Sequence, residues 1–289
     1  MNQHFVPRVY LRQWLNGDGF FIRYRRMGPP NSIRLLSERK TPDGVYWARD
    51  LYSLPEKTMA NGLTGDGVEH LLSANVEQRI ASIVSELGGC SGRLEPGLSE
   101  QVRWLIQTFV ARDPRTIAAI EARVASFVKE NEAEVLRLHA RAQTSTMRSE
   151  IGQYLDPRMP AVQARAMIAG IAASQLVPRS GWLDGVVRVM HSSKIARELG
   201  VLGLDGFPTF ERPVVEWGDN DVGLVATFSI APEILAFVVQ GEGECGWEMA
   251  LRHVAGALRH RRSAICRQKA ADDLWLSEAQ HLIPWAQGE

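Results

Sequence analysis

The sequence predicts an α+β fold, in which strands from the N- and C-terminal parts of the chain share one antiparallel sheet around a large central helical region. Apolar residues recur at helical spacing through the middle of the chain, whereas segments near both ends alternate with period two. Strand-like and helical segments are grouped rather than alternating, which favours α+β over a parallel βαβ arrangement. We expect one domain over residues 1–289, the alternative being a helical subdomain at 64–200 between strand-rich ends.

Two or three short strands are expected between Gly19 and Trp47, because aromatic and β-branched runs are separated there by the turn-forming segments 28–30 and 41–44. Within residues 20–26, alternation gives one buried face and one cationic face that carries Arg23 and Arg25. The first strand is therefore predicted to display positive charge.

The central helices are predicted from their apolar stripes and their breakers. Asp66 is a candidate N-cap with Glu69 three residues later, and Gly88-Gly89 ends the helix that follows. A second helix is expected from about Ser99 to a break before Pro114. Further helices are expected at about 115–142, after Pro160, and at about 183–199.

The period switches to two after Gly203. Strands are expected at 209–217, 222–230 and 234–240, and the first two are predicted to form a hairpin. The pattern then returns to helical spacing from about 246 to 271.

The composition describes an ordinary globular chain with no net charge, since 33 Lys and Arg balance 33 Asp and Glu among 289 residues. Residues 1–49 nevertheless carry a local net charge of +6, from nine basic and three acidic side chains. Three cysteines without CxxC spacing argue against a disulfide framework and a structural zinc site, which favours the cytoplasm. No apolar run approaches the roughly 20 residues that span a bilayer, and no secretory signal opens the chain.

The common catalytic motifs are missing. The sequence has no phosphate-binding GxxxxGK[ST] loop, no GxGxxG after a strand, no GxSxG elbow and no HExxH pair. The seven histidines are scattered, so no metal site is predicted and no cofactor is indicated.

Four blocks resemble domain of unknown function family 4238, a bacterial and fungal group. Residues 4–14 read His-Phe-Val-Pro-Arg-Val-Tyr-Leu-Arg-Gln-Trp and are similar to the family's opening signature; the blocks 48–54 and 105–114 follow in the family's order. The block 208–215 is similar to a family segment reading Thr-Ser-Asp-Asn-Pro, but Phe210 replaces Ser and Glu211 replaces Asp. The resemblance implies no particular activity.

Four residues are candidates for catalysis. His4 has an imidazole whose pKa suits proton transfer, Glu211 is a carboxylate that would orient or oppose it, Arg112 would stabilise anionic charge, and Gln107 would position a substrate. The alternatives are structural: His4 would anchor the terminus, Arg112 would cap a helix end, and Glu211 would form an ion pair. Because Gln107 and Arg112 are five positions apart, a kink near Pro114 is needed to bring them together.

Arg8, Arg23, Arg25 and Arg26 are candidates for anion binding, since a nucleic-acid backbone rewards several basic contacts on one surface. The alternative is that these charges protect an exposed sheet edge. A second basic cluster at 259–269 is also a candidate for anion binding, the alternative there being the exposed side of a helix.

The favoured hypothesis is a cytoplasmic enzyme that acts on a phosphate-containing substrate, in the manner of a nuclease or a hydrolase of antiviral defence. The first alternative is a non-catalytic module that binds nucleic acid or another anionic ligand. The second is a helical scaffold that binds a protein partner. A membrane partner is not expected, and the oligomeric state is left open.

Overall fold

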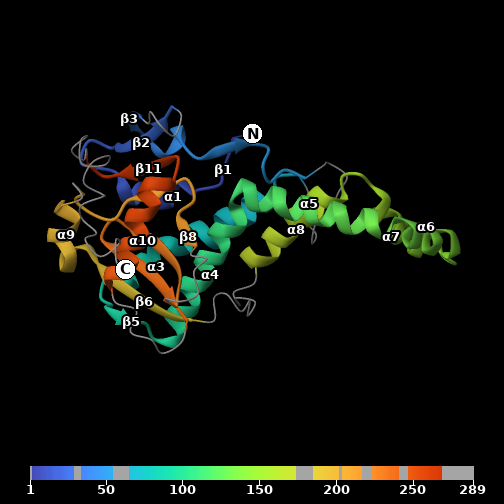
Figure 1. The fold of residues 1–289 in the computed structure, drawn as a ribbon. Helices are drawn as coiled ribbons and strands as arrows, with labels where there is room; N and C mark the ends of the chain where they lie inside the picture. The colour runs from blue at the N-terminus through green and yellow to red at the C-terminus, as the bar shows by residue number, and fades with distance from the viewer. Residues whose placement is uncertain are drawn as a thin grey trace, which may run out of the picture.

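The computed structural model describes residues 2–28, 34–54, 65–173, 185–201, 204–216, 223–240 and 247–268. Its strands form three antiparallel sheets (Figure 1). The five-stranded sheet has the order β5-β6-β10-β9-β8, and consists of Gly92–Arg93, Val186–His191, Ile234–Val239, Leu224–Ala231 and Val214–Glu216. The four-stranded sheet has the order β3-β2-β11-β7, and consists of Arg34–Lys40, Phe21–Met27, Ser263–Cys266 and Thr209–Phe210. A third sheet pairs β1 (Asn2–His4) with β4 (Trp47–Arg49).

Most helices lie in the middle of the chain. The α-helices are α1 (Arg8–Leu11), α2 (Gly67–Leu72), α3 (Gln78–Leu87), α4 (Pro96–Arg112), α5 (Pro114–Glu130), α6 (Glu132–Arg141), α7 (Ser145–Gly152), α8 (Met159–Ala173), α9 (Ala196–Val201) and α10 (Trp247–His260). A π-helical turn, η3 (Ser73–Glu77), joins α2 to α3, and short 3-10 turns are η1 (Arg12–Trp14), η2 (Pro42–Gly44), η4 (Gln153–Leu155) and η6 (Ser192–Ile195). Within these described elements, no helix is both long and apolar enough to cross a membrane.

The predicted α+β fold is confirmed, including the sheet shared by the two ends of the chain. Strand β11 pairs with β2, with Cys266 opposite Ile22 and Ser263 opposite Arg25. The predicted hairpin is also present, because β8 and β9 pair antiparallel, but the expected strand at 209–217 is divided into β7 and β8, which belong to different sheets. Among the described strands, β2 and β3 of the N-terminal part share the four-stranded sheet with late strands, whereas the five-stranded sheet consists of β5 and later strands.

The five-stranded sheet lies between two apolar cores. All six residues of β10 are buried, and successive side chains point to opposite faces of a strand. Ala236 and Val238 belong to the core shared with α3, α4 and α8, whereas Leu235 and Phe237 belong to the core shared with α9, α10 and the four-stranded sheet. The continuous apolar run in this strand is thus explained by burial on both faces.

The N-terminal segment is held against the sheets by buried aromatic residues. The Tyr10 hydroxyl donates to the carbonyl of Ser229 at 2.5 Å and lies 2.7 Å from the Thr209 hydroxyl. The Trp14 indole N–H donates to the carbonyl of Phe207 at 2.9 Å. The Tyr10 ring also contacts the Phe109 ring on α4, with centroids 4.8 Å apart. These contacts bind the chain's first residues to its late strands.

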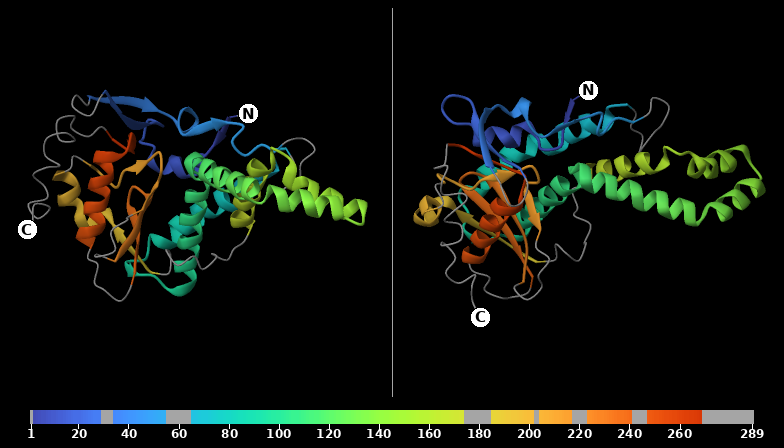
Figure 2. Two further views of the ribbon diagram at one scale, coloured as in Figure 1. Left: turned by 45° about the vertical axis from the view of Figure 1, so that its right-hand side comes forward. Right: turned by 45° about the horizontal axis from the view of Figure 1, so that its top comes forward.

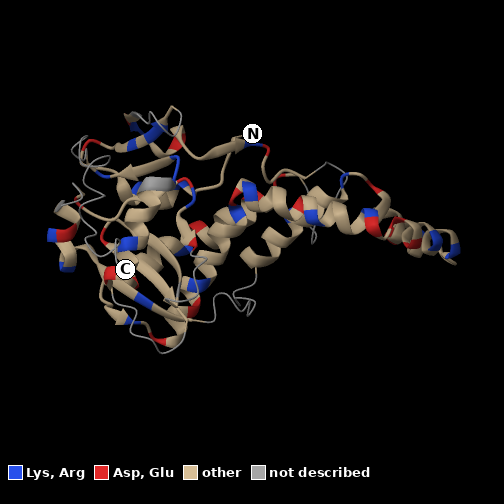
Figure 3. Ribbon diagram, in the orientation of Figure 1, with Lys and Arg blue, Asp and Glu red and all other residues tan. Residues whose placement is uncertain are grey.

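Helices α5 to α8 form an arm that projects from the sheet-containing body, as Figures 1 and 2 show from three directions. Within the arm, α5 packs against α8 and α6 against α7. Figure 3 shows acidic and basic residues interspersed along it. Six large apolar side chains are exposed on the arm, namely Phe127, Leu136, Leu138, Met147, Tyr154 and Met167.

The expected helix at 183–199 is wrong over its first half, which forms β6. Strand β6 lies between β5 and β10, and its Val187 and Val189 enter the larger core. Valine is stiff at χ1 and fits a pleated surface better than a helix, and the sheet supplies partners on both sides. Only α9, at 196–201, retains the predicted helix.

The expected helix at 246–271 is too long. It ends at His260, and residues 263–266 form β11 instead. The carboxylate of Glu211 accepts hydrogen bonds from the backbone N–H of Arg262 at 3.0 Å and of Ser263 at 2.9 Å. These bonds satisfy donors that a continuing helix would have paired internally, so the chain turns into the strand.

The predicted break before Pro114 is confirmed. Helix α4 ends at Arg112, and Asp113 is the N-cap of α5, where its carboxylate accepts from the Arg115 N–H at 2.8 Å. The predicted third helix is divided at Asn131 into α5 and α6.

Candidate functional site

A charged cluster surrounds the C-terminal end of α4 and joins the first three blocks of the sequence. Backbone pairing between β1 and β4 places His4 opposite Trp47. Arg112, the last residue of α4, donates a hydrogen bond to the backbone carbonyl of His4 in this pair of strands. We call the group the N-terminal cluster; its charged members are His4, Arg8, Asp43, Glu69, Glu77 and Arg112.

Arg112 is the centre of the N-terminal cluster and has no exposed surface. Its Nη2 donates to the backbone carbonyl of His4 at 2.5 Å and lies 3.9 Å from a Glu77 carboxylate oxygen. Its guanidinium stands 5.6 Å from the centroid of the Tyr52 ring, and the Tyr52 hydroxyl donates to the Arg112 carbonyl at 3.2 Å. The structure therefore brings His4 and Arg112 together through the histidine's backbone, and not through its imidazole.

Two titratable groups of the N-terminal cluster have shifted pKa values of opposite direction. Burial, followed by the nearby Arg8 charge, lowers the pKa of the half-buried His4 imidazole. Burial raises the pKa of the Glu69 carboxyl, and the Arg112 charge opposes that effect. The His4 Nε2, the Glu69 Oε2 and two guanidinium nitrogens of Arg112 are buried without hydrogen-bond partners among the described residues. A neutral imidazole and a carboxyl that holds its proton more tightly than usual are suited to proton transfer.

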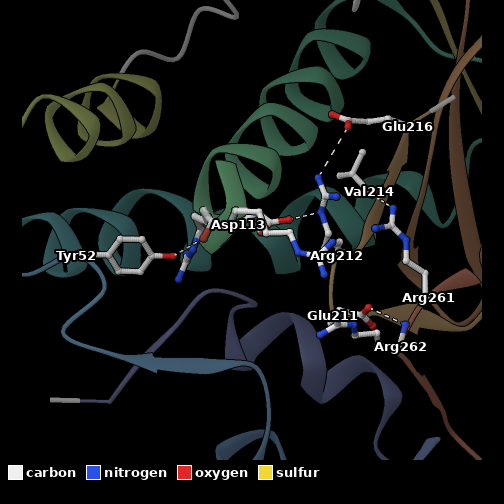
Figure 4. A network of polar contacts seen from close by, with 10 residues as sticks. Tyr52, Asp113, Glu211, Arg212, Val214, Glu216, Arg261 and Arg262 are labelled. Atoms are coloured by element: carbon white, nitrogen blue, oxygen red, sulfur yellow. Dashed lines mark hydrogen bonds and ion pairs between the residues drawn. The ribbon is translucent and has the colours of Figure 1, made fainter. Parts of the chain in front are cut away.

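The hydrogen bonds of the Glu211 carboxylate go to the start of β11. Besides the two backbone bonds described above, its carboxylate accepts from the Ser263 hydroxyl at 3.2 Å. Figure 4 shows the Glu211 carboxylate directed toward Arg262, while Tyr52 lies beyond Asp113 on the other side of the view. The cleft beside Glu211, also lined by Asp113 and Arg212, encloses about 10 Å³, which is room for about one water molecule.

Gln107 is buried on α4, in the same helix as Arg112. Its side chain is 9% exposed. The kink at Asp113 follows both residues and redirects α5 rather than Arg112. The four catalytic candidates thus divide into a contacting pair, His4 and Arg112, a buried helix residue and a strand anchor.

The basic N-terminal residues contact other parts of the chain. Arg8 pairs with Asp43 at 2.8 Å, Arg25 pairs with Glu38 at 2.9 Å, and the Arg26 guanidinium donates to the carbonyl of Leu258 at 2.7 Å. The Arg23 guanidinium stands 5.6 Å from the Tyr46 ring centroid. Strand β2 is an interior strand between β3 and β11, so the alternative interpretation of these charges as edge protection is wrong.

A larger positively charged site lies on the other side of the body, between β6, η6 and the first turns of α10. This cavity encloses about 690 Å³, within the size range of small-molecule sites. We call it the cationic cavity; its polar lining comes from Ser91, Arg188, Lys194, Glu248 and Arg252, and its apolar lining includes Met190, Ile195, Phe237, Trp247 and Met249.

The charges of the cationic cavity are unbalanced. Among the described lining residues, three cations face it against one carboxylate, that of Glu248. In the part of the chain that the structure describes, neither Arg188 nor Lys194 forms an ion pair; Lys194 contacts the Ser91 hydroxyl, and the Arg188 Nε is buried without a partner. The N-terminal end of α10 also borders the cavity and adds positive potential from the helix dipole. The described lining therefore carries an excess of positive charge.

A neighbouring cavity shows that this imbalance is not a general property of the surface. It encloses about 510 Å³ on the edge formed by β5 and the start of α4. Its charged lining consists of two arginines and two glutamates, namely Arg93, Arg103, Glu95 and Glu100. The described lining of this neighbouring cavity has no net charge, whereas the described lining of the cationic cavity has a net positive charge.

Sequence reasoning missed the cavity and three members of the N-terminal cluster, Asp43, Glu69 and Glu77. Arg188 was predicted to lie in a helix, whereas β6 directs it into the cavity with Lys194 following on η6. Glu69 was interpreted as a capping partner of Asp66, yet the Asp66 side chain makes no cap bond and accepts instead from Gln3 and Ser53. Among the described residues, no group of three His, Cys, Asp or Glu side chains is placed to hold a metal ion.

Comparison with known proteins gives one result. A family model described as "Protein of unknown function (DUF4238)" matches residues 2–157, more than half of the chain's 289 residues. No curated protein and no solved structure matches the chain. The matched span contains the whole N-terminal cluster, whereas most of the cationic cavity lies after it. The chain belongs to the DUF4238 family of proteins of unknown function.

Proposed function

We propose that this protein binds a phosphate-containing ligand in the cytoplasm, and that the cationic cavity is the binding site. The observation that carries the proposal is a cavity of about 690 Å³ in which three cations face one carboxylate. Guanidinium groups bind phosphate oxygens in a bidentate manner, and a lysine ammonium adds a third positive charge. The free thiols of Cys90 and Cys266 are compatible with a reducing compartment.

The cavity supports phosphate better than the predicted N-terminal arginines do. Two of those four arginines already pair with carboxylates, and a third donates to a backbone carbonyl. A phosphate at those positions would have to displace an existing partner. At Arg188 and Lys194 it meets cations that lack an ion pair among the described residues.

The test is the thermal stability of the full chain in inorganic phosphate, pyrophosphate and triphosphate. A ligand that binds only the folded state raises the melting temperature as its concentration exceeds the dissociation constant. We expect the shift to grow with ligand charge and to vanish in the cavity variant Arg188→Gln/Lys194→Gln/Arg252→Gln. The control variant Arg123→Gln/Lys129→Gln/Arg141→Gln removes three exposed cations from the arm and should keep the full shift. Equal shifts in both variants would contradict the proposal.

A second candidate function is enzymatic and belongs to the N-terminal cluster. It is favoured by the opposite pKa shifts of His4 and Glu69 beside a buried arginine. In this proposal His4 and Glu69 transfer protons. Arg112 has no exposed surface, so it would position these two groups without contacting the substrate. Gln107 and Glu211 then support the fold around the reacting groups.

The enzymatic candidate is tested by release of inorganic phosphate from nucleoside triphosphates and by cleavage of short DNA and RNA. Glu69→Gln and His4→Gln should each remove turnover while leaving the phosphate-induced rise in melting temperature unchanged. Turnover that survives both substitutions excludes the N-terminal cluster as its source.

A further inference from the structure

The lining of the cationic cavity contains both polar and apolar side chains, which narrows the class of ligand that fits it. A simple inorganic anion uses only the cations. The apolar lining includes the indole of Trp247, whose residue is 38% exposed at the start of α10. An exposed indole beside three phosphate-binding side chains is an arrangement that a planar, phosphorylated molecule would fill.

We propose that the ligand of the cationic cavity is a mononucleotide carrying two or three phosphates, whose base stacks on Trp247. This inference rests on the proposed function, that the cavity binds a phosphate-containing ligand. Every nucleobase has a π face that stacks on an aromatic side chain, so Trp247 supplies affinity without selecting one base. Arg188, Lys194 and Arg252 bind the phosphates.

The carboxylate in the lining suggests where the sugar of the nucleotide would lie. Glu248 follows Trp247 directly and is the only carboxylate among the described lining residues of the cavity. A carboxylate repels phosphate but accepts hydrogen bonds from the two hydroxyls of a ribose, so it is suited to the segment between base and phosphates. Arg252 follows Glu248 by four residues, one turn of α10, so these two side chains lie on the same face of the helix.

The size of the cavity agrees with this assignment. A volume of about 690 Å³ exceeds what three phosphates need and lies in the range of sites for drug-sized molecules. Met190 and Phe237, which are 5% and 4% exposed, form a buried apolar floor. A base stacked on the exposed Trp247 indole above this floor would remove apolar surface from water, which inorganic triphosphate cannot do.

The experiment compares inorganic triphosphate with one purine and one pyrimidine ribonucleoside triphosphate, titrated into the full chain without divalent cations. We expect both nucleotides to bind at least tenfold more tightly than inorganic triphosphate, since base stacking on an aromatic residue gives about that factor. Trp247→Leu should reduce this preference to less than threefold. The matched control is Trp47→Leu, an indole of similar exposure (43%) on β4, which should leave the preference intact.

The outcomes separate the two levels of the proposal. If inorganic triphosphate binds at the cavity but nucleotides bind no more tightly, the nucleotide assignment is overturned and the phosphate site stands. A preference that persists in Trp247→Leu also overturns the assignment. If neither triphosphate nor nucleotide binds the wild-type chain, the proposed function fails as well.

Discussion

Arg112 is the residue on which the arrangement of the N-terminal segment depends most. It is a large cation with no exposed surface, and its strongest contact is a backbone carbonyl, that of His4. Burying a charge is costly unless the group is paired and hydrogen-bonded, so the surrounding acceptors and the Tyr52 ring must offset the loss of water. The residue thereby ties β1 to the end of α4.

Replacing Arg112 with Met should destabilise the chain by about 2–4 kcal/mol, because the half-buried Glu77 loses its cation and the His4 carbonyl loses its donor. The measurement is urea denaturation followed by circular dichroism. Arg137→Met is the control, since Arg137 pairs with Glu134 on the exposed surface and should change stability by less than about 0.5 kcal/mol. Similar losses in the two variants would refute the structural role of Arg112.

His253 gives a pH-dependent prediction at the same scale. It is 2% exposed, its Nδ1 lies 3.1 Å from the Thr227 hydroxyl, and burial lowers its pKa to about 4. In the unfolded chain the pKa is about 6.5, so between these values the unfolded state binds more protons. The free energy of unfolding is therefore at its full value above about pH 6.5, and it falls as the pH is lowered toward 4, by about 3 kcal/mol from this group.

The measurement is chemical denaturation at several pH values between 4 and 7. His253→Gln retains a side chain that can hydrogen-bond Thr227 but does not titrate in this range. We expect its stability to depend less steeply on pH than that of the wild type. Parallel profiles for the two proteins would exclude His253 as the source of acid sensitivity.

At the scale of elements, the junction between α10 and β11 shows how one side chain decides where a helix ends. Glu211 pairs with two backbone N–H groups and one hydroxyl of residues 262–263, and the Ser263 hydroxyl in turn lies 2.7 Å from the Tyr46 hydroxyl. The contacts connect the late block of the sequence to the strand that pairs with β2. The carboxylate thus helps to fix the sheet shared by both ends of the chain.

Glu211→Ala should lower stability by about 2 kcal/mol, because the backbone N–H groups of Arg262 and Ser263 lose a charged acceptor. Hydrogen exchange should accelerate selectively at the amides of β11. Glu216→Ala provides the comparison, since that carboxylate lies 4.0 Å from Arg212 and is half exposed. If β11 exchanges equally in the two variants, Glu211 does not hold the strand.

Sequence reasoning recovered elements whose signals are local and missed those that depend on distant partners. The break at Asp113-Pro114 and the hairpin of β8 and β9 follow from local chemistry, and both are present. Strand β6 and strand β11 depend on neighbours far along the chain, so helical spacing in their surroundings was misleading. Because residues 186–191 were expected to form a helix, the sequence did not predict that Arg188 lines a cavity.

At the scale of the molecule, the five-stranded sheet contributes to both apolar cores. Side chains of β10 alternate between the two cores. Loss of packing in one core would therefore destabilise a strand on which the other core also depends. The expectation of a single domain stays a prediction, and this shared strand supports it physically.

We therefore expect one cooperative unfolding transition, with coincident midpoints in far-ultraviolet circular dichroism and tryptophan fluorescence. Trp14 and Trp104 are buried in the larger core, so the fluorescence signal reports tertiary structure near the N-terminal segment and α4. A helical signal that outlasts the fluorescence change would instead indicate that the helical region, including the arm, forms a separate folding unit.

Calorimetric titration of inorganic triphosphate into the wild-type chain and into the two triple charge variants tests the central claim most directly. The account predicts saturable binding to the wild type and to the arm variant, weakening steeply as salt is raised, and loss of at least tenfold in affinity in Arg188→Gln/Lys194→Gln/Arg252→Gln. Undiminished affinity in that cavity variant would contradict the account.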